Sequence, residues 1–72
     1  MPFIQVHLLE GITTETKREL IRGITETTAS ILDTPPGTIR LVIDEVPLEN
    51  WGTAGISMKE KLQDNVGSSE TR

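Results

Sequence analysis

The apolar pattern of this chain leaves room for only two strands of useful length, separated by one amphipathic helix. Residues 3–9 alternate between two faces, which is the period of a β-strand. In residues 14–32 apolar side chains recur at three- and four-residue spacing, which predicts a helix with Thr13 or Thr14 as its N-cap. Residues 39–46 form a β-branched run, which predicts a second strand. The order predicts an α/β fold: a βαβ unit with parallel strands and a right-handed crossover.

The remaining segments read as turns and a tail. Pro35, Pro36 and Gly37 cannot continue the helix, so residues 33–38 form the turn back to the second strand. A glycine-punctuated stretch at 51–56 predicts a short turn or hairpin. We expect one domain over residues 1–62 and a polar, disordered tail over residues 63–72.

The predicted unit is too small to be stable alone. Folding would bury roughly 7,000 Å², and if about 60% of that surface is apolar its burial at ~25 cal/mol/Å² supplies on the order of 105 kcal/mol. This about equals the ~108 kcal/mol lost in ordering the chain. One helix covers one face of a two-stranded sheet, whereas the second strand is apolar on both faces. We therefore expect two units to pair into a four-stranded sheet with two helices, in a homo-oligomer or in a hetero-oligomer of similar chains.

The composition excludes several classes of function. A net charge of −4 and a pI near 4.8 give no basic surface for nucleic acid. No apolar run approaches the ~18 residues of a membrane span, and the N-terminus lacks the pattern of a secretory signal, so we expect a cytoplasmic protein without a membrane partner. One histidine and no cysteine cannot build the usual transition-metal site within one chain, so we expect no such metal site.

Pro2 is a candidate for chemistry that needs no side chain. A small second residue usually permits removal of Met1, and the mature chain would then begin with a free secondary amine. An α-amino group titrates near ~7.7–8.0, and burial or a nearby cation lowers that value toward the range of a general base. The alternative is a proline that merely begins a strand.

Two further side chains have both a structural and a functional interpretation. Alternation places Arg40 on the strand face opposite the helix, where it forms an interface ion pair or binds a carboxylate in bidentate fashion. Trp51, in a glycine-flanked loop, is a packing residue or the wall of a small site.

The positions of the other polar residues in the sequence favour structural roles for them. His7 is expected to be a buried, hydrogen-bonded histidine, because no carboxylate or nucleophile is placed near it in sequence. Asp44 and Glu45 are adjacent and so point to opposite faces, which argues against a paired-carboxylate site. The charges near the start of the helix are interpreted as a solvated face; they are Glu15, Lys17, Arg18 and Glu19. Weak ion pairs are allowed by the spacing of Arg18, Glu19, Arg22 and Glu26 on the face opposite the apolar one.

Four motifs in order resemble a known family. These are MPFIQVHLLEG, TxxxKRELIRGIT, LDTPPGTIRLVIDEV and NWGTAG, which together cover about residues 2–58. The pattern resembles the small subunits of the 4-oxalocrotonate tautomerase family, whose members begin with a catalytic proline. The resemblance implies βαβ subunits assembled as trimers of dimers, with active sites where chains meet.

The resemblance also implies a role for each candidate residue. Pro2 matches the proline that moves a proton between oxygen and carbon of an enol, first as general base and then as general acid. Arg40 matches an arginine from a neighbouring chain that binds the substrate's carboxylate and carbonyl end. Trp51 stands where the family has an aromatic wall, and Thr38 occupies a position near the substrate.

Ile12 departs from the family pattern. The best-known members have an arginine there, which grips the second carboxylate of a dicarboxylate substrate. Losing such a contact costs on the order of 1.5–3 kcal/mol of binding. Either the substrate carries one carboxylate, or a different chain supplies the arginine, or the reaction differs from the usual one.

These expectations converge on a cofactor-free tautomerase that ketonises small 2-hydroxydienoates or enol-pyruvates. The chemistry would use Pro2 for the proton and Arg40 for the carboxylate of a small-molecule substrate, in a homo-hexamer or a hetero-hexamer. Two alternatives stay open: a hydratase or dehalogenase of an unsaturated acid, and an accessory subunit of a hetero-hexameric tautomerase.

Overall fold

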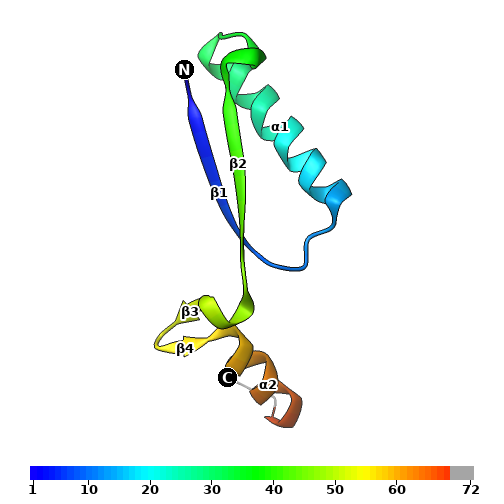
Figure 1. Cartoon of the computed structure of the whole chain (residues 1–72), viewed down its shortest axis with the longest axis vertical. Coiled ribbons are helices and arrows are strands. Elements are labelled where there is room, and N and C mark those ends of the chain that lie inside the picture. Colours follow the sequence, from blue (N-terminus) through cyan, green and yellow to red (C-terminus); the bar gives the residue numbers. More distant parts are fainter. Residues whose placement is uncertain (69–72) are drawn as a thin grey trace.

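The computed structural model describes the backbone of residues 1–68 and the side chains of residues 1–63, and its first half is the predicted strand, helix and strand (Figure 1). Strand β1 (Phe3–Leu9) is followed by helix α1 (Thr14–Leu32), the 3₁₀ turn η1 (Pro36–Thr38) and strand β2 (Arg40–Val46). The second half, beyond the far end of β2, contains η2 (Leu48–Asn50), β3 (Gly52–Thr53), β4 (Ile56–Ser57) and α2 (Met58–Ser68).

The two long strands are parallel, which confirms the βαβ prediction. They pair in register from Phe3 opposite Arg40 to Leu9 opposite Val46. Helix α1 covers one face of this sheet, and the apolar side chains of that face are half-buried: Ile4, Val6, Leu8, Leu41 and Ile43. The second strand begins one residue later than predicted, because the amide of Ile39 donates to the carbonyl of Pro36 and closes the turn.

Both ends of α1 are capped by the local sequence. The Thr13 side chain accepts a hydrogen bond from the amide of Thr16 at 3.1 Å, so Thr13 is the N-cap. At the other end Asp33 adopts a left-handed conformation, with φ of 55°, and its amide bonds the carbonyls of Ala29 and Ser30. The amide of Thr34 also donates to the Ala29 carbonyl, at 3.0 Å. These bonds end the helix immediately before the proline turn.

The buried core of one chain is small and lies near that turn. In the described part of the chain, Ala29 and Ile39 are the buried apolar residues, whereas Phe3 is 65% exposed. The accessible surface is 5256 Å², about a fifth more than the ~4,400 Å² expected of a folded monomer of this mass. The outer sheet face is therefore open in the single chain, as the predicted need for partner chains requires.

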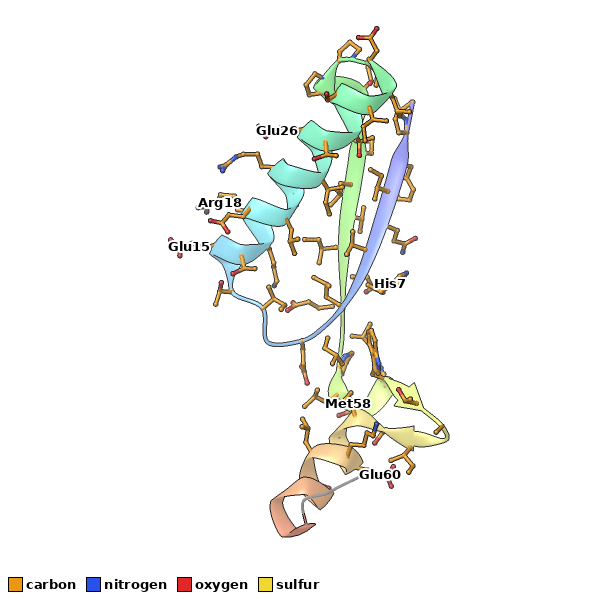
Figure 2. All side chains as sticks on the ribbon, turned by 180° about the vertical axis from the view of Figure 1, so that it is seen from behind. His7, Glu15, Arg18, Glu26, Met58 and Glu60 are labelled. Atoms are coloured by element: carbon orange, nitrogen blue, oxygen red, sulfur yellow. The ribbon has the colours of Figure 1, made fainter. Side chains whose placement is uncertain are left out.

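An ion pair ties α1 to the sheet. The Nζ atom of Lys17 lies 2.8 Å from Oε1 of Glu45, and both side chains are about one-third exposed. The prediction that Lys17 belongs to the solvated helix face was wrong, because the helix turns this residue toward β2. Figure 2 shows Glu15, Arg18 and Glu26 pointing away from the sheet, as predicted. Among the described side chains, the charged residues of that face do not form the weak ion pairs that we expected there.

The hairpin predicted at 51–56 is present. Strands β3 and β4 pair antiparallel, and the two residues between them, Ala54 and Gly55, have φ of 55° and 83°. Two successive positive φ values are typical of a type I′ turn, which matches the twist of a hairpin.

Helix α2 was not predicted. It continues to Ser68, into the stretch 63–72 where we expected a polar tail, and residues 69–72 lie outside the described part. The domain boundary after residue 62 stays a prediction. No helix within residues 1–68 is both long and apolar enough to cross a bilayer.

The link between α1 and β2 predicts an acid-sensitive contribution to stability. The hydrogen bond from Lys17 lowers the pKa of the Glu45 carboxyl below its ordinary value of 4.5, with a smaller contribution from the Lys17 charge. This contribution is present above the ordinary pKa and is lost as pH falls through the lower folded-state pKa. Glu45→Gln should therefore flatten the fall of thermal unfolding temperature between pH 5 and pH 3, measured at one chain concentration. Glu26→Gln is the matched control; equal slopes for Glu45→Gln and the unaltered chain would contradict the assignment.

Candidate active site

The ladder between the strands holds Pro2 and Arg40 together. The amide of Arg40 donates to the carbonyl of Pro2 at 3.0 Å, and Phe3 is the register partner of Arg40. Because β1 and β2 are parallel, both strands begin at the same end of the sheet. Pro2 is half-buried there and Arg40 is exposed. The fold thus puts at one end of the sheet, within a single chain, the two residues that the sequence singled out for proton transfer and carboxylate binding, whereas the resemblance implied an arginine from a neighbouring chain.

The guanidinium of Arg40 is available for an anion. Arg40 lies on the sheet face opposite α1, as the alternation predicted, and its Nη1 donates to the carbonyl of Gly37 at 3.0 Å. The ion pairs among the described side chains do not include Arg40. A guanidinium has five N–H donors, so one bond to a carbonyl leaves a fork that fits a carboxylate.

The hydroxyl of Thr38 is engaged within its own turn. It donates to the carbonyl of Pro35 at 2.8 Å and lies 2.9 Å from the hydroxyl oxygen of Thr34. A hydroxyl has one hydrogen, so in this arrangement Thr38 has none to give to a substrate. The direct substrate contact expected of Thr38 stays a prediction. The structure shows its hydrogen bonds within the turn.

Trp51 and Ile12 lie at the opposite end of the sheet. Trp51 is half-buried between η2 and β3, where its carbonyl accepts the amide of Met58 at 2.7 Å. Ile12 lies in the loop after β1, which Figure 1 shows at the same end. The seven residues of β2 span roughly 20 Å at ~3.3 Å each. A single chain therefore does not bring Trp51 to Pro2.

His7 (labelled in Figure 2) is hydrogen-bonded, as predicted, but its side chain is 55% exposed rather than buried. Its partner is a carboxylate, since its Nδ1 atom lies 3.0 Å from Oδ2 of Asp44. The register places His7 opposite Asp44, a relation that spacing along the chain does not reveal. Asp44 and Glu45 do point to opposite faces, as predicted, toward His7 and Lys17 respectively. His7 follows Pro2 by five residues along β1. At ~3.3 Å per residue, the His7–Asp44 pair therefore lies about 16 Å from Pro2.

A groove along α1 contains none of the candidate residues. Its lining side chains all come from that helix: Thr16, Glu19, Leu20, Gly23, Ile24, Thr27 and Thr28. The candidate residues Pro2 and Arg40 lie at the start of the sheet and not on this helix surface.

Comparison with known proteins identifies the family of this chain. The family model described as tautomerase enzyme matches residues 2–61. The chain is 42% identical over 60 residues to a 2-hydroxymuconate tautomerase from Comamonas testosteroni, covering 83% of this chain and 95% of the relative.

Solved structures give the same result. Among 4-oxalocrotonate tautomerase isozymes from Methylibium petroleiphilum, one chain superposes with a TM-score of 0.85 at 36% identity, covering 88% of this chain and 98% of its own. A chain of a heterohexamer 4-oxalocrotonate tautomerase from Chloroflexus aurantiacus J-10-fl superposes with a TM-score of 0.80 at 42% identity. The match covers 83% of this chain and 97% of that chain. Since these matches span the βαβ unit and the hairpin together, the chain belongs to the tautomerase enzyme family and is an isomerase of that family.

Proposed function

We propose that this tautomerase converts small enol acids, of the 2-hydroxydienoate or enol-pyruvate class, to their keto forms without a cofactor. The observation that carries the proposal is the hydrogen bond between the Arg40 amide and the Pro2 carbonyl. It places a candidate base and an available guanidinium at one end of the sheet. The relatives named as 2-hydroxymuconate tautomerases support the substrate class.

The proposed proton transfer uses one nitrogen twice. After removal of Met1, the neutral Pro2 nitrogen takes the proton from the enol hydroxyl, and negative charge develops on the enolate oxygen. The protonated nitrogen then delivers that proton to carbon, so the substrate is isomerised and Pro2 returns to its starting state. Arg40 binds the carboxylate and stabilises the charge on the enolate oxygen.

The proposed site is complete only between chains. Trp51 lies at the far end of β2 from Pro2, so the indole that excludes water must come from another copy. The exposed outer sheet face and the small core of one chain support the same conclusion. We propose a homo-hexamer built as a trimer of dimers, located in the cytoplasm.

Ile12 favours a second candidate. Its loop lies at the same end of the β1–β2 sheet as Trp51, and its apolar side chain cannot bind a second carboxylate. A similar protein is a heterohexamer. In this second candidate the chain is a subunit whose partner, a related chain, supplies the missing cation. No structural observation favours the hydratase or dehalogenase alternative.

The N-terminal nitrogen provides the first test. Inserting Glu between Met1 and Pro2 retains the methionine, and the Pro2 nitrogen becomes an amide with no basic lone pair. Ketonisation, followed by the ultraviolet absorbance of the enol, should slow by about 10²–10⁴-fold, the usual contribution of a general base. Pro2→Ala should also slow the reaction, since a flexible primary amine is less well placed. Intact mass confirms each N-terminus, and an unchanged rate in the inserted variant would exclude Pro2.

The guanidinium provides the second test. Arg40→Ala removes charge-assisted hydrogen bonds worth about 1.5–3 kcal/mol, so kcat/KM should fall about 10- to 150-fold for a monocarboxylate enol. Arg40→Lys keeps the charge but not the fork, and it should recover part of the loss. Wild-type kcat/KM in Arg40→Ala would make this residue structural.

The assembly provides the third test. The chain purified alone should have the native mass of a hexamer and should turn over enols. Activity that appears only after a related chain is added would support the accessory role instead. Mixing with a chain that carries an arginine at the position of Ile12 distinguishes these outcomes.

A further inference from the structure

We propose that Thr34 is a positioning residue for Arg40, acting through Thr38 and the η1 turn. This inference rests on the proposed function, because it concerns how the carboxylate-binding guanidinium is held in place. Thr34 was not singled out by the sequence, and its side chain touches neither Pro2 nor Arg40 directly in the hydrogen bonds of the described residues.

The direction of the hydrogen bond between the two threonines follows from counting hydrogens. The Thr38 hydroxyl donates its single hydrogen to the Pro35 carbonyl at 2.8 Å. Thr34 must therefore be the donor in the 2.9 Å contact with Thr38, which is part-buried. The result is a relay that runs from the Thr34 hydroxyl through the Thr38 oxygen to the Pro35 carbonyl.

This relay closes the turn that presents the Gly37 carbonyl. The amide of Thr38 also donates to Pro35, at 3.1 Å, and the amide of Ile39 donates to Pro36 at 3.1 Å. Gly37 lies between these bonds, so its carbonyl is held in a fixed direction. That carbonyl accepts Nη1 of Arg40 at 3.0 Å, which orients the guanidinium.

The turn is anchored at both ends to the best-packed part of the chain. On one side the Thr34 amide donates to the carbonyl of buried Ala29. On the other side Ile39 is buried, and the next amide, that of Arg40, donates to Pro2. Arg40 is thus fixed at its backbone by Pro2 and at its guanidinium by the turn. Without the relay the long arginine side chain gains rotamer freedom that substrate binding must then remove.

The decisive experiment compares an acid substrate with its uncharged ester. Thr34→Val removes the hydroxyl and keeps the branched shape. For phenylenolpyruvate, kcat/KM should fall by up to about tenfold, mainly through KM, because substrate binding must then immobilise a rotamer-rich side chain, which costs up to about this factor in affinity. For its methyl ester, which has no carboxylate for the guanidinium, kcat/KM should change less than twofold.

Matched variants separate positioning from folding. Thr34→Ser keeps the hydroxyl and should retain wild-type values for both substrates. Thr14→Val makes the same chemical change at an exposed site in the first turn of α1 and should also be neutral. If Thr34→Val fails to assemble, Thr34→Ala removes the same hydroxyl with a smaller side chain and should give the same loss restricted to the acid.

The outcomes distinguish the inference from the function on which it rests. Equal losses for acid and ester, or no loss for either, would overturn the positioning role of Thr34. A further loss for the acid when Thr34→Val is added to Arg40→Ala would also overturn it, because the relay then has no guanidinium to hold. If Arg40→Ala itself leaves the acid reaction unchanged, the proposed function fails first.

Discussion

The parallel ladder between β1 and β2 is the interaction on which the rest of this molecule depends. Its register decides which residues of two distant segments become neighbours, and a shift by one residue would exchange the two sheet faces. The rung between the Arg40 amide and the Pro2 carbonyl creates the candidate active site. Four residues further along the strands, the register places His7 beside Asp44 on the outer sheet face. On the face covered by α1, Glu45 contacts Lys17.

The ladder also leaves the single chain incomplete. One helix covers one face, so the large apolar side chains of the other face have no covering layer, and Phe3 and Val42 remain exposed. Burying that surface is the natural source of the free energy that a core of this size lacks. Under the proposed function, stability and chemistry call for the same event, because association would cover the outer face and bring an indole toward the proline.

Much of the fold could be predicted from local patterns. Period-two and period-3.6 spacing located β1, α1 and β2 to within one residue, and the proline-rich turn and the glycine-rich hairpin followed from backbone chemistry. Contacts that depend on register or on helix phase could not be predicted in this way. Lys17 with Glu45, His7 with Asp44 and Thr34 with Thr38 join residues whose proximity follows only from the folded backbone. Helix α2 was missed because the stretch was interpreted by its polar composition, although Met58, Leu62 and Val66 recur at four-residue spacing and Ser57 with Glu60 forms a capping box.

The separation of Pro2 from Trp51 by the length of β2 has a genetic consequence. Under the proposed function each catalytic pocket draws on more than one polypeptide, so two alleles damaged at opposite ends can compensate for each other in a mixed population of chains. Pockets that pair an intact proline from one allele with an intact indole from the other would regain function. Conversely, a defective copy expressed alongside a normal one would damage its neighbours' pockets as well as its own.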